Sequence, residues 1–494
     1  MLFNEAPIMT DTEYAPIAAA TVTQWHSEAD VVIVGFGAAG SCASIEAAEA
    51  GAEVLVLERA SGISGTTCSA AGHFYLGGGT RPQLANNIED TVEDMFNYLM
   101  ANTPEPEEDK IRLYCEQSVS HFNWLLEKGV PFNDGFYRKK HFEQPTDECL
   151  IWSGNEKAWP FSEKAKPAPR GHKVEKTGSE GGTLAMKKLT ATAEALGVKF
   201  QFDANVRNLV VDESGKICGV RYTHFKEERF VRARQGVVLA AGGFAMNQAM
   251  LEEHCPRLAD AGIYKQGNPN DDGAGISLGQ AAGGEAIHMD GALITAPFYP
   301  PESLLKGILV NKHGKRFINE DSYHARTMCA CLEQPDGIAY LIVDNANFER
   351  PEMQMQELID AWESVEQMEA DLELPTWSLQ QTLSDYNKHA ANGDDPEFHK
   401  YSDWLVPLVE LPYAALQCSA GKSVYVGFTL GGLRVSKDAQ VLTLDSGQPI
   451  SGLYAAGACA SNIAQDGAGY SSGTCLGESS FFGRRAGLHA AGSS

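Results

Sequence analysis

The sequence predicts an α/β fold built around a parallel sheet, and three stretches of its 494 residues carry that prediction. Residues 31–34 (VVIV) form a continuous apolar run that ends at a glycine, as does a strand buried on both faces of a parallel sheet. The small, Ala-rich segment over residues 40–51 predicts a helix, and residues 53–57 (EVLVL) predict a second buried strand. A strand, a helix and a parallel strand in this order make one βαβ unit.

The composition is that of a folded globular chain with a strong negative charge. Apolar residues make up 43% and charged residues 21%, which is enough apolar material to bury a large core. The 39 Lys and Arg against 65 Asp and Glu leave a net charge of −26, so nucleic-acid phosphates and anionic membranes repel the chain. We therefore expect no nucleic-acid partner and no membrane-surface partner.

Targeting signals and metal-binding patterns are not evident. No apolar run approaches the ~18–20 residues of a membrane span, and residues 1–16 lack the basic start and apolar core of a signal peptide. The sequence has 11 Cys, an odd number, and no two of them form a C-x-x-C motif. Its 13 His show neither H-x-H nor H-E-x-x-H spacing. We expect a soluble, cytoplasmic protein without disulfide scaffold, iron–sulfur cluster or metal site.

The remaining elements follow from apolar periodicity and from turn residues. Strand-then-glycine endings recur at residues 237–243 (VVLAAGG) and 453–457 (LYAAG). The local patterns further predict an acidic, weakly structured lead-in over 1–28, helices over 91–129 broken at 103–109, a long surface loop over 150–181, a helix over 183–196, strands over 205–211 and 218–222, and helices over 346–400.

A glycine-rich turn directly after the first strand predicts a dinucleotide site. Gly35-Phe36-Gly37-Ala38-Ala39-Gly40 is a GxGxxG motif that opens a helix, where Gly35 permits the tight turn and Gly37 lets the backbone approach a pyrophosphate. Gly40 allows close helix–strand packing, and the helix N-terminus attracts the diphosphate. Glu58, at the end of the second strand, is placed to bind an adenosine ribose 2′-OH and to repel the 2′-phosphate of NADP.

A flavin suits the sequence better than a nicotinamide nucleotide. Residues 61–72 (SGISGTTCSAAG) follow Glu58 almost at once and form a small, hydroxyl-rich loop that suits the diphosphate, ribityl chain and ring edge of FAD. The sequence contains no second GxGxxG motif for a nicotinamide nucleotide. We therefore predict FAD as the cofactor, contacted in this loop by Ser64, Thr66, Thr67, Ser69, Ala71 and Gly72.

Further motifs occur in a characteristic order along most of the chain. They are EVLVLER (53–59), GVVLAAGGFAMN (236–247), NDDGAG (270–275), NKHGKRFINE (311–320), TLGGL (429–433), GLYAAG (452–457) and GRRAG (483–487). Together with the GxGxxG motif, this set resembles the fumarate reductase/succinate dehydrogenase-type flavoprotein superfamily, which also contains the 3-ketosteroid dehydrogenases.

The resemblance implies a Rossmann-like FAD-binding domain interrupted by an α+β capping, substrate-binding domain. We expect an N-terminal extension at 1–28, the FAD-binding domain at 29–285 and 425–494, and the cap at 286–424. By the resemblance, further FAD contacts are Arg59, Val206, Ala241, Gly242, Asn247, Asp272, Gly457, Ala458, Gly473, Thr474, Cys475 and Leu476. The family's usual acidic residue is replaced by Ala458, and no histidyl-flavin motif is evident near His73, so FAD is expected to be non-covalent.

Two departures from the family pattern argue against a dicarboxylate substrate. Tyr470 stands where fumarate reductases carry an Arg that grips a substrate carboxylate bidentately. Residues 321–325 (DSYHA) replace the region of the second family Arg, the proton donor. A dicarboxylate would meet no cationic clamp and would leave a buried charge unpaired, which is costly.

Hydroxyl groups suit the desaturation of a neutral ketone instead. That reaction needs a neutral donor for the enolate oxygen, a base for the α-proton and a hydride acceptor. The stretch Tyr470-Ser471-Ser472-Gly473, together with Tyr323, resembles the active site of 3-ketosteroid Δ4-(5α)-dehydrogenases. By that resemblance Tyr470 binds the C3 carbonyl, Ser472 abstracts the C4 proton and Tyr323 relays it, while His324 is expected to be structural.

The resemblance predicts an FAD-dependent 3-ketosteroid Δ4-(5α)-dehydrogenase with an electron acceptor that the sequence does not identify. Two alternatives within enzymes remain, the Δ1 type and a reductase of another neutral enone. A flavin-binding electron carrier or sensor without a small substrate is a third, although Tyr470 at a substrate position argues against it.

Overall fold

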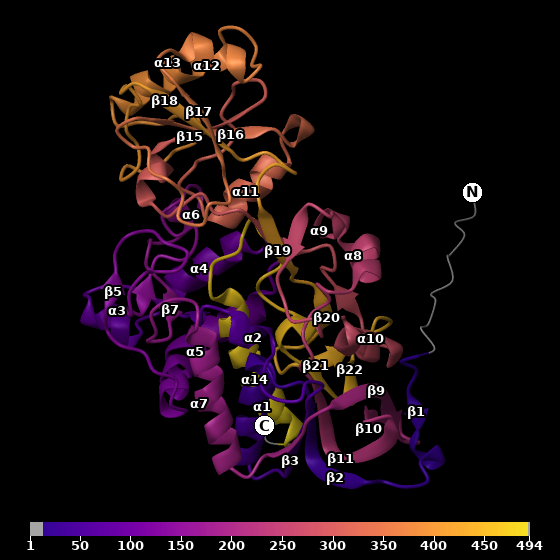
Figure 1. The fold of residues 1–494 in the computed structure, drawn as a ribbon. Helices are drawn as coiled ribbons and strands as arrows, with labels where there is room; N and C mark the ends of the chain where they lie inside the picture. Colours follow the sequence, from indigo (N-terminus) through magenta and orange to yellow (C-terminus); the bar gives the residue numbers. More distant parts are fainter. Residues whose placement is uncertain (1–12, 493–494) are drawn as a thin grey trace.

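A nine-stranded sheet forms one end of the molecule, as the apolar runs of the sequence predict (Figure 1). The computed structural model describes residues 13–492. The strand order is β1-β9-β10-β11-β2-β3-β8, with β22 paired to β11 and β21 to β22. The strands are β1 Ile17–Ala18, β2 Ser27–Val34, β3 Val54–Leu57, β8 Lys199–Gln201, β9 Ala204–Val211, β10 Ile217–His224, β11 Glu227–Leu239, β21 Gln440–Leu442 and β22 Pro449–Ala455.

Four parallel strands at the centre of this sheet bring their carboxyl ends to one edge. β2 pairs in parallel with β3 and β11, and β11 pairs in parallel with β22. The backbone N–H of Gly35 donates to Leu57 O at 2.9 Å, that of Ala240 to Val34 O at 2.8 Å and that of Ala456 to Leu239 O at 3.0 Å. The glycine-bearing ends of segments far apart in the sequence therefore meet at the edge where open α/β sheets bind ligands.

Small residues let two helices pack closely on this sheet. α1 (Ala38–Glu49) lies along α14 (Thr474–Ala490), and both also contact the sheet (Figure 1). A Cβ atom at Gly483 would lie 2.5 Å from Ala39 O, and one at Gly487 would lie 2.1 Å from Ala43 O. Any larger residue at these two positions would force the helices apart, which explains the GRRAG motif.

The other helices near α1 surround a small sheet, β4-β7-β6-β5. These elements are α2 Thr66–Ser69, β4 His73–Tyr75, α3 Arg81–Ala85, α4 Val92–Asn102, α5 Glu108–Glu127, β5 Phe136–Tyr137, β6 Leu150–Ile151, α6 Phe161–Lys164, β7 Gly171–Lys173 and α7 Gly181–Ala195. The predicted helices over 91–129 and 183–196 are confirmed as α4, α5 and α7.

The prediction of a surface loop over residues 150–181 is wrong. This segment contains β6, α6 and β7, and much of it is buried. Its polar residues suggested exposure, but they find partners inside the protein. Arg170, with no exposed surface, donates to both carboxylate oxygens of the buried Asp90, at 2.7 and 3.1 Å. A buried charge needs such a partner, and sequence alone does not reveal that it has one.

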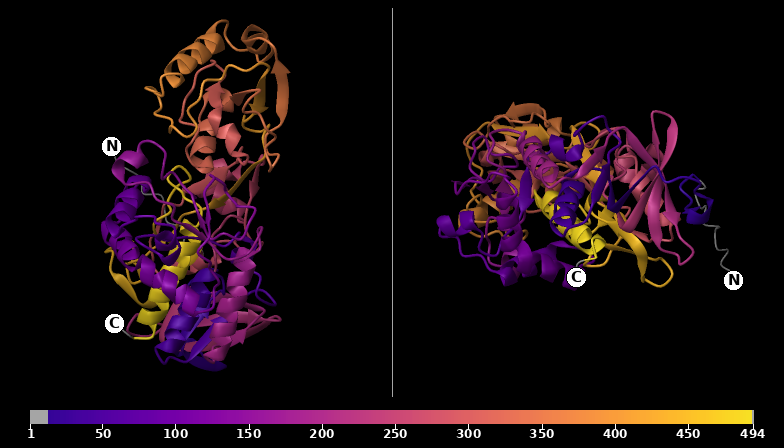
Figure 2. Two further views of the ribbon diagram at one scale, coloured as in Figure 1. Left: turned by 90° about the vertical axis from the view of Figure 1, so that its left-hand side faces the viewer. Right: turned by 90° about the horizontal axis from the view of Figure 1, so that it is seen from below.

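A separate four-stranded sheet, β15-β16-β18-β17, forms the opposite end of the elongated molecule (Figures 1 and 2). It has its own apolar cluster, in which side chains of β16 and β18 pack against α12 and α13. The elements of this end are β15 Ile308–Asn311, α11 His324–Leu332, β16 Ala339–Asp344, β17 Leu358–Trp362, α12 Val365–Asp371, α13 Ser378–Ala390 and β18 Tyr413–Gln417.

The prediction that residues 346–400 are helical holds for α12 and α13 only. Residues Leu358–Trp362 form β17, the edge strand that pairs with β18. No glycine or proline separates β17 from α12, and the one boundary signal is Ser364, the N-cap whose hydroxyl accepts the backbone N–H of Gln367 at 3.2 Å.

Short strands connect the two ends. β19 lies between β12 and β14, and β20 lies between β13 and β23. β13 and β14 fall inside the range predicted for the cap and pair with strands that follow it, so the domain limits at 286 and 424 stay a prediction. The connecting elements are α8 Gln248–His254, α9 Pro256–Ala259, β12 Ile263–Lys265, α10 Ala274–Ala281, β13 Ala286–Ile287, β14 Ala292–Thr295, β19 Tyr425–Thr429, β20 Gly432–Arg434 and β23 Ala460–Ser461.

Two further expectations concern the N-terminus and membranes. Of the predicted lead-in, residues 1–12 lie outside the described part, while β1 pairs in parallel with Val210 and Val211 of β9. Between residues 13 and 492, no helix is both long and apolar enough to cross a membrane. The predicted α/β class is confirmed.

Candidate functional site

A cavity of about 770 Å³ runs from the GxGxxG turn to the loop that carries Tyr470. Its volume lies in the usual range for a small-molecule or cofactor site. The predicted site residues all line it, with the exception of Gly40, Asn247 and Thr474. The cavity therefore brings together predicted cofactor positions and predicted catalytic positions that are far apart in the sequence.

The nucleotide end of the cavity is built by the first βαβ unit. Gly35 has φ +94°, and a Cβ there would lie 2.5 Å from Ala240 O, so only glycine fits this turn. The Glu58 carboxylate accepts the backbone N–H of Phe36 and of Ala60, each at 2.8 Å. These bonds fix the carboxylate, which keeps lone pairs for a ribose hydroxyl. Val206 lies in the wall of the same cavity.

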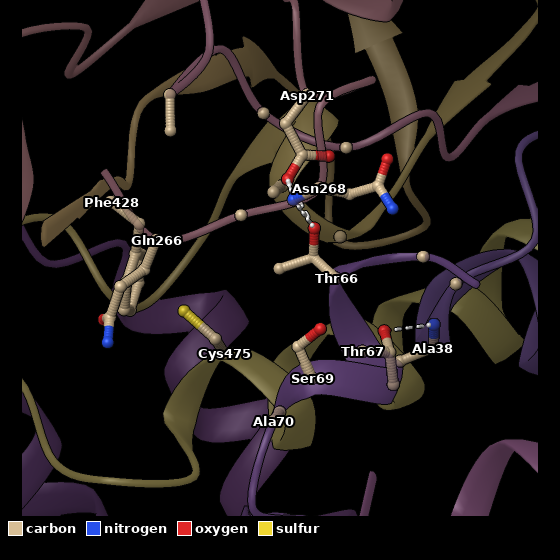
Figure 3. A pocket seen from close by; sticks show the side chains of 18 of the residues that line it. Ala38, Thr66, Thr67, Ser69, Ala70, Gln266, Asn268, Asp271, Phe428 and Cys475 are labelled. Atoms are coloured by element: carbon tan, nitrogen blue, oxygen red, sulfur yellow. Dashed lines mark hydrogen bonds between the residues drawn. The ribbon is translucent and has the colours of Figure 1, made fainter. Parts of the chain in front are cut away.

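The middle of the cavity is lined by hydroxyls and amides (Figure 3). The Thr67 hydroxyl accepts the backbone N–H of Ala38 at 3.0 Å, at the start of α1. Thr66 donates to the Asp271 carboxylate, and the backbone N–H of Asn268 donates to the Thr66 hydroxyl at 2.8 Å. Burial raises the pKa of the Asp271 carboxyl above its usual value. The hydroxyl-rich loop is thus held against the segment that carries the NDDGAG motif.

Three predicted cofactor residues lie behind the cavity wall. Gly40 is a packing position, since a Cβ there would lie 2.1 Å from Gly35 O. The Asn247 side chain accepts the N–H of Met250 at the start of α8, and its amide donates to Asp272 O at 2.8 Å. The Thr474 hydroxyl donates to Ser471 O at 2.9 Å. Gly40 and Asn247 thus support the wall residues Gly35 and Asp272, and Thr474 supports Ser471, which lies between the wall residues Tyr470 and Ser472.

Tyr323, Tyr470 and Ser472 meet at the far end of the cavity. The Tyr323 hydroxyl and Ser472 Oγ are 2.7 Å apart and share a hydrogen bond. The rings of Tyr323 and Tyr470 are 6.1 Å apart between centroids, and both side chains are buried. The Tyr470 hydroxyl accepts the backbone N–H of Cys475 at 3.4 Å, and as a phenol it can also donate one hydrogen bond. The three predicted catalytic residues therefore form one cluster.

Burial sets the protonation states around this cluster. It raises the pKa of the Tyr323 and Tyr470 phenols above their ordinary values, so both are neutral hydrogen-bond donors. It lowers the pKa of His324 to about 3. The His324 Nδ1 and the Thr295 hydroxyl are 2.7 Å apart, so this ring is a fixed, neutral and weakly basic neighbour.

Sequence reasoning missed the apolar wall of the cavity beside this cluster. The wall includes Phe142, Leu293, Pro297, Met355, Val426 and Phe428. Phe428 packs edge-on against Tyr470, with ring centroids 6.0 Å apart, and lies beside Gln266 in Figure 3. These residues come from separate segments and follow no motif, so no local signal could have identified them.

No arginine of the described cavity wall lies beside Tyr470. Among the described residues that line the cavity, Arg59 is the one arginine, and it is paired with Asp272 at 2.5 Å in the nucleotide half. The cluster at the far end consists of neutral hydroxyls and apolar side chains. This arrangement can bind a neutral carbonyl compound. Lys265 also lines the cavity, but its ammonium group donates to the backbone O of Asp260 at 2.6 Å and is not aimed at Tyr470 by any contact in the structure.

The nucleotide half fits a flavin dinucleotide. A helix N-terminus, a glycine turn and a hydroxyl-rich loop succeed one another along the cavity, as the diphosphate and ribityl parts of FAD require. At Gly37 a Cβ would meet only the Thr67 hydroxyl, at 3.2 Å, so the protein itself leaves space there. That space is needed when a pyrophosphate approaches the backbone.

We expect a Gly37→Val variant to purify without its cofactor and to be colourless. The valine side chain would occupy the space that the pyrophosphate needs, while its contacts within the protein are few. The FAD released by heat denaturation is measured to check this, since the sequence predicts a non-covalent cofactor. Gly62→Val is the matched control, since no atom lies within 4 Å of a Cβ at Gly62. Full FAD content in Gly37→Val would contradict the cofactor's placement.

Comparisons with known proteins agree with this geometry. A family described as FAD binding domain matches residues 30–476. The solved structure of a 3-ketosteroid-Δ4-(5α)-dehydrogenase from Rhodococcus jostii RHA1, in complex with 4-androstene-3,17-dione, is 44% identical with a TM-score of 0.90, covering 97% of this chain and 99% of that chain.

Two curated relatives are more distant. A 3-oxo-5-alpha-steroid 4-dehydrogenase from Comamonas testosteroni is 28% identical, over 90% of this chain and 95% of the relative. A probable fumarate reductase, Ifc3, from Shewanella frigidimarina is 27% identical, over 93% of this chain and 74% of the relative. The similarities therefore extend over both the nucleotide half and the Tyr470 half of the cavity.

Proposed function

Because the chain belongs to the FAD binding domain family and its cofactor is FAD, we propose that it holds FAD without a covalent bond and introduces a C4–C5 double bond into 3-keto-(5α)-steroids. The observation that carries the proposal is the cluster of Tyr323, Tyr470 and Ser472 at the end of the cofactor cavity. The 44% identical structure contains a 3-ketosteroid, which supports the same substrate class here.

Tyr470 binds the C3 carbonyl of the substrate. Its neutral phenol donates a hydrogen bond to the carbonyl oxygen and stabilises the enolate that develops there. Because burial keeps the phenol protonated, it donates without a prior change in charge. A neutral donor also costs less to bury than an arginine that lacks a carboxylate partner.

Ser472 takes the C4 proton, and Tyr323 makes this possible. Serine is a weak base, so its hydroxyl proton must leave as the C4 proton arrives. The 2.7 Å contact to the Tyr323 oxygen is the path for that proton, and the Tyr323 proton in turn passes toward solvent. Bound FAD supplies the two-electron acceptor for the hydride that leaves C5.

The apolar wall supports a large, rigid, neutral substrate. Phe142, Leu293, Pro297, Met355 and Val426 offer flat contacts of the kind that a fused-ring steroid needs. Pro297, Tyr323 and Met355 lie within residues 286–424, and we propose that this segment acts as the substrate-binding cap.

Substrate charge tests the proposal. We expect fumarate to leave chemically reduced flavin unoxidised, and succinate to leave oxidised flavin unreduced, because no arginine of the described cavity wall lies beside Tyr470. A 5α-3-ketosteroid should reduce the oxidised flavin under anaerobic conditions, as followed by the loss of its visible absorbance. Turnover of fumarate at the rate of the ketosteroid would contradict the proposed function.

A further inference from the structure

We propose that Asn155 is a positioning residue that holds the two halves of the proton path, Tyr323 and Ser472, in register. The inference rests on the proposed function, because it assigns Asn155 a role through those two residues. Asn155 does not line the cavity and has no exposed surface. It lies in the segment that the sequence predicts to be a surface loop.

The Asn155 side chain bridges the two chain segments that carry the hydroxyls. Its Oδ1 accepts the backbone N–H of Tyr323 at 2.7 Å, and its Nδ2 donates to the backbone O of Ala468 at 3.3 Å. The Tyr323 N–H precedes the first turn of α11 and has no partner within that helix. Ala468 lies two residues before Tyr470. One amide therefore connects the segment of Tyr323 to the loop of Tyr470 and Ser472.

Neighbours of Asn155 hold the same loop. The backbone N–H of Ser472 donates to Ser153 O at 2.8 Å. The Tyr98 hydroxyl accepts the N–H of Asn155 at 2.8 Å and lies 2.9 Å from Ser471 Oγ. A Cβ at Gly154 would lie 2.1 Å from Ser471 Oγ, so this segment packs directly on the loop.

An asparagine is the side chain that this bridge requires. One end of the amide accepts and the other donates, which matches a buried N–H on one side and a buried carbonyl on the other. Without the bridge, both backbone groups lose a partner, and each would move to recover one. A displacement of about 1 Å in a reacting group can cost about 10²-fold in rate.

We expect Asn155→Ala to slow flavin reduction by a 5α-3-ketosteroid about 10–100-fold, with FAD content and steroid affinity changed little. Because the proton path is disturbed, the isotope effect of deuterium at C4 should rise above the wild-type value. In a crystal structure of the variant, Tyr323 and Ser472 should lie farther apart than 2.7 Å. Asn155→Asp is the second variant, since it retains the volume and the acceptor to Tyr323.

In Asn155→Asp, the ionised carboxylate would face Ala468 O without a donor. The protonated form restores the donor, so the rate relative to wild type should recover as the pH falls through the pKa of this buried carboxyl. Asn387→Ala is the matched control. The Asn387 side chain also accepts one backbone N–H and donates to one backbone O, in this case both of Leu408 and each at 2.7 Å. It lies in the distant four-stranded end, and we expect its loss to leave the isotope effect unchanged.

Three results would overturn the inference: wild-type rates in Asn155→Ala, a rate loss with an unchanged C4 isotope effect, or a variant structure that retains the 2.7 Å contact. A wild-type protein that no 5α-3-ketosteroid reduces would refute the proposed function instead. The structure of the variant would then still decide whether Asn155 sets the separation of Tyr323 and Ser472.

Discussion

A Ser472→Ala variant is expected to reduce its flavin with a 5α-3-ketosteroid about 10²–10⁴-fold more slowly than the wild-type protein, because it lacks the base for the C4 proton. The Ser472 hydroxyl acts in the transition state, so FAD content and steroid affinity should change little. The measurement is the rate constant of flavin reduction after anaerobic mixing, together with exchange of the C4 hydrogen into solvent.

Ser480→Ala is the control for this variant. Ser480 is a buried serine of α14, the helix that follows Ser472; its hydroxyl donates to Leu476 O at 2.7 Å and lies 2.8 Å from His121 Nε2, and it does not line the cavity. It should retain the wild-type rate. Normal C4 exchange and normal flavin reduction in Ser472→Ala would place the base elsewhere, and His324 would be the next residue to test.

A Tyr470→Phe variant is expected to lose about 10²–10³-fold in rate, the usual cost of removing one donor to a developing oxyanion. The phenyl ring retains the packing of Tyr470 against Phe428, so the loss should come from the hydroxyl alone. This variant loses the hydrogen bond to the enolate oxygen, which Ser472→Ala retains. Its affinity for enol-like inhibitors should therefore fall together with its rate of flavin reduction. Both are measured with the purified, FAD-loaded protein.

Tyr425→Phe provides the matched comparison. Tyr425 is buried, and its hydroxyl donates to Cys418 O at 2.7 Å, but its side chain is absent from the described cavity wall. We expect this change to lower the thermal stability and to spare the rate. Equal rates in Tyr470→Phe and wild type would show that another group binds the carbonyl.

The nucleotide half of the site could be predicted from the sequence because its requirements are local. The strand, the glycine turn and the helix are consecutive in the sequence. Gly35 and Gly37 therefore predict the turn geometry that a dinucleotide cofactor needs. Glu58 could be predicted as well, because it stands at the end of the next strand in the same βαβ unit. The parallel register of β2 and β3 then brings these local features together.

In the substrate half of the site, only residues that belong to a sequence motif could be predicted. Tyr470 and Ser472 were found because they stand at positions of the family's C-terminal motif, beside glycine-bearing α14. Phe142, Pro297 and Met355 come from segments that meet only in the folded protein, so their contribution depends on tertiary contacts.

The segment around Asn155 differs from the surface loop that its sequence predicts, for a physical reason. Its Lys, Pro and Gly content is that of an exposed loop, yet several of its buried polar groups pair with side chains and backbone atoms of other segments. Arg170 with Asp90, and Asn155 with Tyr323, are examples. Sequence patterns record polarity, whereas burial depends on whether each polar group finds its partner.

The position of the new double bond tests the central proposal most directly. A 5α-3-ketosteroid labelled with deuterium at C5 is mixed anaerobically with the protein, and the steroid product is identified. We predict a product with a C4–C5 double bond that has lost the C5 deuterium as the flavin is reduced. A product with a C1–C2 double bond and retained deuterium, or no product and no flavin reduction, would contradict it.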